Sequence, residues 1–173
     1  MSDGTQSRAE WVSSALENFE QRLLKYALGI LGDVGRAQDV VQDTFLKLYQ
    51  QDPQTLNGQL LPWLYTVCRH QALDLCRKEN RMTTATADDE LDVLELTQSR
   101  EPAPLEQLEA SEEMSAVLAH LARLPPSQQE CLRLKFQHSL SYQEISSITG
   151  HTVSNVGYLI HVGLKTLRDR CRS

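Results

Sequence analysis

Apolar residues recur every three or four positions in two separate blocks of this 173-residue chain, and this spacing limits the folds that the chain can adopt. Such spacing puts apolar side chains on one face of an α-helix. The first block lies within residues 1–81 and the second within 111–173, and neither contains a convincing alternation of apolar and polar residues. The pattern therefore predicts an all-α protein with two small helical modules.

The first block divides into three expected helices. One ends near Gly32, and the next begins after Asp33, whose carboxylate can cap it, and continues to about Gln50. Residues 51–59 contain Pro, Asn and Gly and should form a loop, after which Pro62 suits the first turn of a third helix that ends near Arg81. The expected apolar stripes are Leu16, Phe19, Leu23, Tyr26 or Ala27 and Ile30; Ala37, Val40, Val41, Phe45 and Leu48; and Trp63, Leu64, Val67, Cys68, Ala72 and Leu75.

The second block begins with a helix near Ser111 that stops at a pair of prolines, 125 and 126. Two capping boxes follow, Ser127 with Glu130 and Ser141 with Glu144, in which the serine oxygen accepts a helix N–H and the glutamate reaches back to the serine amide. Helices should therefore start at Ser127 and at Ser141. The stripe expected on the first helix of this block is Met114, Val117, Leu118 and Leu121.

Charge is distributed unevenly between these blocks. Residues 82–113 carry ten acidic side chains against Arg100 alone, whereas residues 114–173 have a net charge of +4 and the whole chain has −6. Periodicity fades between Met82 and about Ala110, where Thr, Ala, Asp and two prolines dominate, and a short helix at 91–96 has little support. We expect a flexible acidic linker at 82–110 that joins modules at 1–81 and 111–173.

Several function classes find no support in the residues. The chain has no apolar run of the ~20 residues that span a bilayer, no secretory signal, no phosphate-binding glycine loop, no nucleophile elbow and no cluster with metal-ligand spacing. The four cysteines lie far apart, as reduced packing thiols of a cytoplasmic protein do. We therefore expect no enzyme activity, no catalytic residue, no cofactor, no metal and no membrane partner.

Residues 144–160 have the pattern of a helix-turn-helix. A helix with Ser146 at a close crossing ends at Gly150, which allows a left-handed turn, and a second helix opens with Thr152 as its cap. In such a motif the second helix lies in the DNA major groove. An ordinary two-helix corner of an all-α protein remains the alternative. The residues expected to face inward on the second helix are Val153, Val156, Ile160, Leu164 and Leu167.

Longer segments carry a resemblance to a known family. LARLPPSQQECLRLKFQHSLSYQEISSITGHTVSNVGYLIHVGLKTLRDR resembles region 4 of extracytoplasmic-function (ECF) sigma factors, and GDVGRAQDVVQDTFLKLY with LPWLYTVCRHQALDLCRKENR resembles region 2. The resemblance covers 15–81 and 111–170. It implies a sigma-70 family subunit that binds core RNA polymerase through the β′ coiled coil and the β subunit and directs initiation at promoter DNA. The sequence alone does not tell whether an anti-sigma factor exists as a further partner.

The resemblance assigns a docking surface to the helix at 34–50. Asp39, Gln42, Asp43 and Leu46 follow the i, i+3, i+4, i+7 spacing and share a stripe opposite the apolar one. In the family this stripe docks on the β′ coiled coil. A solvated acidic face is the alternative interpretation of the same residues.

The resemblance also implies two promoter contacts. The first is a basic strip that reads and melts the −10 element, while the 51–60 loop receives a flipped base; its residues are Arg69, His70, Asp74, Arg77, Lys78 and Arg81. The second is the exposed face of the last helix, which reads the −35 element; its residues are Ser154, Asn155, Tyr158, His161 and Lys165. Asn155 can pair with adenine.

The last helix departs from the family pattern, because Gly157, Leu159, Val162 and Leu164 stand where Lys or Arg is usual. Thr149 and His151 also replace turn residues that are usually apolar. Two alternatives therefore stay open beside the sigma factor. One is a helix-turn-helix regulator that binds duplex DNA without polymerase, and the other is a sigma-like adaptor that binds only proteins.

Overall fold

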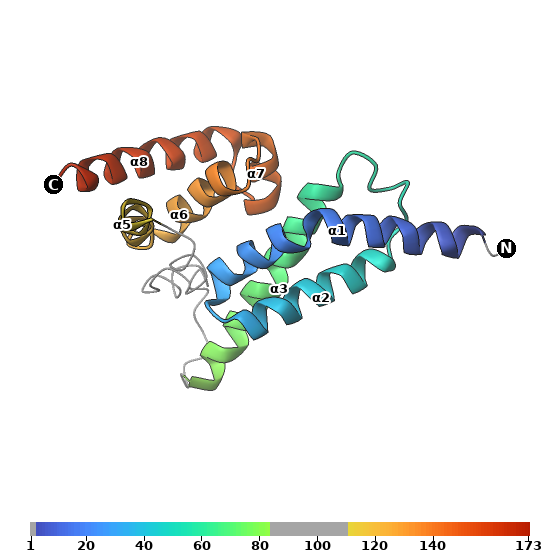
Figure 1. The fold of residues 1–173 in the computed structure, drawn as a ribbon. Helices are drawn as coiled ribbons and strands as arrows, with labels where there is room; N and C mark the ends of the chain where they lie inside the picture. Colours follow the sequence, from blue (N-terminus) through green and yellow to red (C-terminus); the bar gives the residue numbers. More distant parts are fainter. Residues whose placement is uncertain (1–2, 84–110) are drawn as a thin grey trace. The chain divides into compact units, whose positions relative to one another are not determined.

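The computed structural model describes residues 3–83 and 111–173, and within these ranges every regular element is a helix (Figure 1). The chain divides into two compact units, residues 1–75 and 76–173. Helix α3 (Leu60–Thr83) begins in the first unit and ends in the second. The all-α prediction is therefore confirmed, and the predicted linker at 82–110 lies almost entirely outside the described residues.

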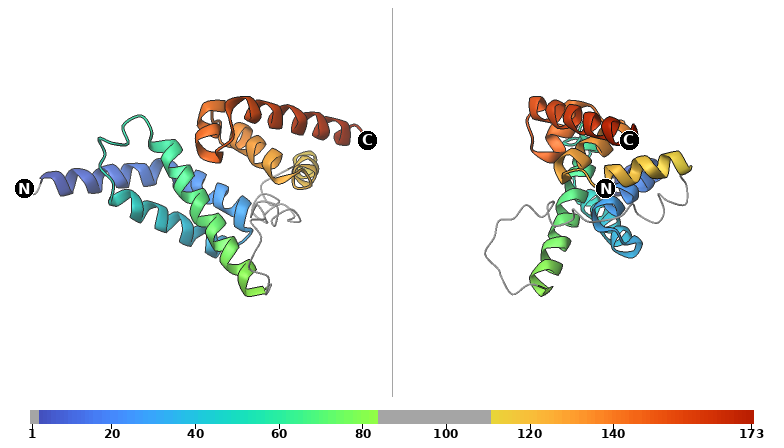
Figure 2. Two further views of the ribbon diagram at one scale, coloured as in Figure 1. Left: turned by 180° about the vertical axis from the view of Figure 1, so that it is seen from behind. Right: turned by 90° about the vertical axis from the view of Figure 1, so that its left-hand side faces the viewer.

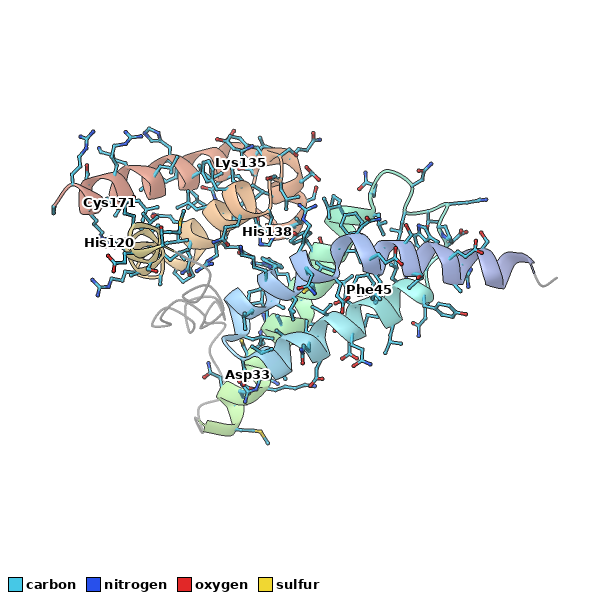
Figure 3. All side chains as sticks on the ribbon, viewed as in Figure 1. Asp33, Phe45, His120, Lys135, His138 and Cys171 are labelled. Atoms are coloured by element: carbon cyan, nitrogen blue, oxygen red, sulfur yellow. The ribbon has the colours of Figure 1, made fainter. Side chains whose placement is uncertain are left out.

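Helices α1 (Asp3–Leu31) and α2 (Val34–Tyr49) form an antiparallel pair in the first unit, and they lie side by side in Figures 1 and 2. Gly32 ends α1 with φ 71°, a left-handed conformation that glycine adopts without steric cost. Asp33 then caps α2, because its Oδ1 accepts a hydrogen bond from Arg36 N at 2.9 Å; Figure 3 labels it at this turn. The end of α1 and the cap of α2 are as predicted.

The core of the first unit lies where α3 meets this pair. Leu23, Leu48 and Leu64 are buried, and the rings of Tyr26 and Tyr65 pack at a centroid distance of 5.1 Å. The fully or nearly buried positions include most of the predicted stripes: Leu23, Tyr26, Ala27, Ile30, Ala37, Val40, Val41, Phe45, Leu48, Leu64, Cys68 and Ala72. Leu16 is an exception, since its side chain is exposed on α1.

The predicted loop between α2 and α3 is present, and it is organised by one aspartate. Asp52 Oδ1 accepts from Gln54 N at 3.0 Å, and Asp52 O accepts from Thr55 Oγ1 at 2.8 Å. Leu56 is buried and anchors the loop, while Gly58 has φ 78°. Such Asx-type bonding fixes a turn without regular secondary structure.

The second unit contains α5 (Glu112–Leu121), α6 (Pro126–Leu132), the π-helix η2 (Arg133–Gln137), α7 (Tyr142–Thr149) and α8 (Val153–Cys171). Helix α8 packs against α5, α6 and α7. The buried core includes Leu118, Leu121, Ala122, Leu124, Cys131, Leu132, Leu134, Leu140, Ile145, Ile148, Val156 and Ile160.

The capping box predicted at Ser127 is wrong. Helix α6 begins at Pro126 with Pro125 in the cap position and without a side-chain cap. Proline lacks an N–H and fixes φ near the helical value, so it starts a helix at little cost. Ser127 therefore stands at the second helical position, and Glu130 is buried.

Three other predicted core positions are wrong. Val153 on α8 is 47% exposed, and Met114 and Val117 on α5 are also exposed. Each lies in the first turns of its helix, where the buried stripe has only begun. The π-helix η2 was not predicted either; it leads to Ser139, which has a positive φ of 55°.

Among the described residues, none of the helices has the length and apolar character needed to cross a membrane. All four cysteines are free thiols: Cys68, Cys76 and Cys131 are buried as predicted for packing residues, and Cys171 is exposed at the end of α8, where Figure 3 labels it.

Candidate functional site

Helix α2 separates a buried face from a polar one. Its buried residues leave Asp39, Gln42 and Asp43 exposed, and Leu46 is 60% exposed in the same row. The 3.6-residue helical repeat puts these four side chains on one stripe. Two carboxylates, one amide and a solvent-facing leucine form a surface that suits a basic partner helix.

A groove runs beside this stripe between α1 and α2. It has a volume of about 520 Å³, and Gln42 and Leu46 of the stripe form part of its wall. The other lining residues are Leu16, Glu20, Gln21, Leu24, Gln38, Val41 and Phe45. The sequence pattern placed Leu16 on the apolar stripe of its helix, but its side chain is exposed and lines this groove.

The residues of the predicted basic strip lie along helix α3. His70, Lys78 and Arg81 are exposed, and so are Asp74 and Arg77, whereas Arg69 is half-buried. Trp63 in the first turn is also half-buried, beside the buried Leu64. Lys78 and Arg81 of the strip are therefore open to solvent.

Helices α7 and α8 form the predicted helix-turn-helix. Ser141 caps α7 through a complete capping box, with Ser141 Oγ accepting from Glu144 N at 3.1 Å and Glu144 Oε1 accepting from Ser141 N at 3.0 Å. Gly150 ends α7 with φ 83° in the left-handed region. Thr152 caps α8 by accepting from Asn155 N at 3.1 Å.

The outer face of α8 is the one predicted to read DNA. Ser154, Asn155, Tyr158, His161 and Lys165 are all exposed, and Tyr158 is 63% exposed. Of these five, Lys165 alone carries a permanent positive charge. The face is thus rich in hydrogen-bonding groups and poor in charge.

A cation–π contact beside this face was not predicted from the sequence. Lys135 Nζ lies 5.1 Å from the centroid of the Tyr142 ring. The same ring lies over Gly157, since a Cβ added at Gly157 would stand 3.6 Å from Tyr142 Cε2. Lys135, labelled in Figure 3, comes from η2, so sequence spacing alone gave no signal that it meets Tyr142.

Two family models match these two structural regions. Residues 16–82 match sigma-70 region 2, and residues 114–167 match sigma-70 region 4, so that together they cover more than two thirds of the chain. The chain belongs to the ECF group of the sigma-70 family. The region 2 match precedes the region 4 match along the chain.

Named ECF sigma factors are similar over most of the chain. The ECF RNA polymerase sigma factor SigM of Bacillus subtilis is 28% identical over 131 residues, covering 76% of this chain and 77% of the relative. BldN of Streptomyces coelicolor is 27% identical, over 87% of this chain and 56% of the relative. The present chain therefore spans only about half the length of some relatives.

The fold has a counterpart among solved structures. The sigma factor RpoE of Bartonella quintana, solved in complex with the anti-sigma factor NepR, matches with a TM-score of 0.66 over 91% of this chain and 94% of its own. The sequences are 20% identical, so this match supports the fold.

Proposed function

We propose that this ECF sigma factor binds core RNA polymerase through region 2 and directs transcription initiation at promoter DNA through regions 2 and 4, without catalysing a reaction itself. The observation that carries the proposal is the exposed stripe on α2 within the chain segment that matches region 2. A DNA-binding protein that works alone has no use for such an acidic surface.

The docking step uses Asp39, Gln42, Asp43 and Leu46. The carboxylates pair with basic side chains of the β′ coiled coil, and Leu46 removes apolar area from water at the contact. Contacts with the β subunit complete the assembly. The domain roles follow the predicted division, with docking and the −10 element at 1–81, an acidic linker at 82–110 and the −35 element at 111–173.

The −10 element is contacted by the strip on α3, whose cationic side chains hold phosphates while the 51–60 loop receives an extruded base. Phosphate contacts fix the register, and the captured base offsets the cost of unstacking. The residues proposed for this contact are Arg69, His70, Asp74, Arg77, Lys78 and Arg81.

The −35 element is contacted by α8, which places Ser154, Asn155, Tyr158, His161 and Lys165 in the major groove. Because this face carries little positive charge, we expect duplex binding by the free protein to be weak. The log–log dependence of its association constant on salt should have a slope on the order of −2 to −4. Titrations of the full chain with duplex DNA at several salt concentrations measure this slope, and Lys165→Ala should make it shallower by about 1.

Charge reversal tests the docking stripe. The double variant Asp39→Lys, Asp43→Lys should lose co-purification with core polymerase, because removal of one partner of an interfacial charge pair often costs ~2–5 kcal/mol. Glu10→Lys, Glu17→Lys is the matched control: it changes the net charge equally, at exposed positions of α1. Unchanged co-purification of the stripe variant at moderate salt, with unchanged helical content, would refute the docking assignment.

Gel shifts with and without core polymerase separate the proposal from its alternatives. A sigma factor shifts promoter DNA only with core, a self-sufficient regulator shifts it alone, and an adaptor shifts it in neither case. An anti-sigma factor is a further proposed partner, since the RpoE structure of the same fold holds one. Such a partner should compete with core polymerase for the chain in pull-down assays.

A further inference from the structure

The backbone of His151 is held in the turn between α7 and α8 by two side chains of α7. Ser146 Oγ donates to His151 O at 2.6 Å, and His151 N donates to Thr149 Oγ1 at 3.3 Å. Thr149 Oγ1 is itself fixed, because it donates to Ile145 O at 2.8 Å. These bonds use only the main chain of His151, so any residue except proline could make them, and the imidazole is not required for the turn.

The imidazole instead contacts the exposed face of α8. Asn155 is the third residue of that helix, and its Nδ2 lies 3.3 Å from His151 Nδ1. In α7 the third residue is Glu144, whose carboxylate reaches back to the cap residue's own N–H. In α8 the residue at the same position is Asn155, and its side chain contacts the imidazole ring of His151, the residue before the cap.

This contact sets the orientation of the Asn155 carboxamide. With the amide nitrogen toward the ring, Asn155 Nδ2 donates and His151 Nδ1 accepts in the tautomer that carries its proton on Nε2. One N–H of Asn155 is used by the ring. The other N–H and Oδ1 remain as an adjacent donor and acceptor in a fixed order. Adenine presents N7 as acceptor and N6 as donor in the major groove, which is the complementary pair.

We propose that His151 is a positioning residue that fixes the donor–acceptor order of the Asn155 carboxamide and thereby gives α8 its preference for adenine. This inference rests on the proposed function of α8 as the helix that reads the −35 element. An unrestrained amide can turn by 180° and offer the reversed order, and it loses more rotamer freedom on binding. On a face with so little charge, specificity depends more strongly on such a preset hydrogen-bonding group.

The test uses the full chain assembled with core polymerase on a promoter library randomised in the upstream element, with transcripts sequenced. Asn155→Ala identifies the position that Asn155 reads, as the one whose adenine preference disappears. His151→Leu should weaken the preference for adenine at that same position by roughly three- to ten-fold, with the other positions unchanged. His151→Asn should restore it, because its Oδ1 provides an acceptor near the place of Nδ1.

A second measurement needs no DNA. In the free full-length chain, the side-chain ¹⁵N–¹H resonances of Asn155 should shift in His151→Leu and return toward the parent values in His151→Asn. The inference is overturned if the chemical shifts of these resonances do not change in His151→Leu, or if the adenine preference is the same in the parent and in His151→Leu. It is also overturned if Asn155→Ala changes no position while the parent selects promoters normally. If the parent with core polymerase selects no sequence at all, the proposed function itself fails, and the inference fails with it.

Discussion

Thr44 and Cys68 show how single polar side chains are accommodated in the core of the first unit. Thr44 is completely buried, and its Oγ1 donates to Val40 O at 2.8 Å within the same helix. Cys68 Sγ lies 4.0 Å from Leu23 O. Burial raises the pKa of the Cys68 thiol to about 12, against a smaller opposing effect of the hydrogen bond with Thr44. The thiol is therefore protonated and unreactive near neutral pH.

The raised pKa of Cys68 predicts a loss of stability in alkali. The folded state holds the proton more tightly than the unfolded state, so the contribution to stability is complete below 9.0, the ordinary pKa of a thiol, and is lost as pH rises toward about 12. Urea unfolding between pH 8 and 11 should show a free energy of unfolding that falls more steeply in the parent than in Cys68→Ala. Cys171→Ala, at an exposed thiol, is the control and should keep the parent slope. Parallel pH profiles for parent and Cys68→Ala would contradict this account.

At the scale of the element, the helix starts are decided by caps, and the two serine positions of the second unit differ. Ser141 makes both halves of a capping box at α7. Ser127 has the same sequence spacing to a glutamate but lies inside α6, which starts at Pro126. The first N–H groups of a helix have no acceptor within the helix. Proline at the start removes one of these N–H groups, whereas a serine cap accepts a hydrogen bond from one.

These two serines give a matched pair of substitutions. Ser141→Ala should lower the free energy of unfolding of the second unit by about 1 kcal/mol, because it leaves a helix N–H without its acceptor. Ser127→Ala removes no cap and should cost less than half as much. Urea titrations followed by circular dichroism provide both values. Equal losses for the two variants would mean that Ser127 has a stabilising role that the structure does not contain.

Helix α8 contains two glycines in different surroundings. A Cβ added at Gly163 would stand 2.7 Å from Cδ1 of Leu132, a buried residue of α6, which packs against α8. A Cβ added at Gly157 would meet Tyr142 Cε2 at 3.6 Å, an ordinary contact. Only Gly163 is therefore required for close helix packing.

The two glycines predict opposite results from the same substitution. Gly157→Ala should raise the free energy of unfolding by roughly 0.5–1 kcal/mol, since alanine loses less backbone entropy than glycine in a helix. Gly163→Ala gains the same propensity, but it displaces Leu132 at an overpacking cost of roughly 1–3 kcal/mol, so its net effect should be a loss. Thermal or urea unfolding of both variants measures the difference. A stabilised Gly163→Ala would show that Leu132 moves aside freely.

At the scale of the whole molecule, the notable property is charge separation along the chain. Residues 82–113 carry a net charge of −9, and residues 114–173 carry +4. A polyanionic segment tethered to a basic module competes with DNA for that module's cationic side chains. The overall charge of −6 therefore understates the positive charge that residues 114–173 would present to DNA.

Neutralising four acids of the predicted linker tests this competition. Replacement of Asp88, Asp89, Glu90 and Asp92 by Asn or Gln should raise the affinity of the free chain for non-specific duplex DNA at low salt. The gain should fade toward physiological ionic strength, where charges are screened over roughly 8 Å. Fluorescence anisotropy at two salt concentrations gives the comparison with the parent chain. If the variant binds no better than the parent at low salt, the segment is a tether without electrostatic effect.

The sequence by itself determined the helices, the two modules and the family, because these depend on local periodicity, local caps and contiguous motifs. It predicted the Asp33, Ser141 and Thr152 caps, the left-handed Gly150 and the exposed faces of α2 and α8. Each of these needs only residues within a few positions of one another. The specific roles of those exposed faces stay predictions.

Only the tertiary structure decided which residues with the same sequence spacing become buried, exposed or caps of a helix. It placed Ser127 inside α6, left Val153 exposed, introduced η2 and brought Lys135 onto the Tyr142 ring. The groove between α1 and α2 and the contact of His151 with Asn155 are also properties of the tertiary structure. Periodicity shows which positions of a helix are apolar, but it does not show which other elements cover them. The path of the backbone decides which residue caps a helix when several residues could do so. Both depend on which elements meet in space, and the linear pattern does not contain that information.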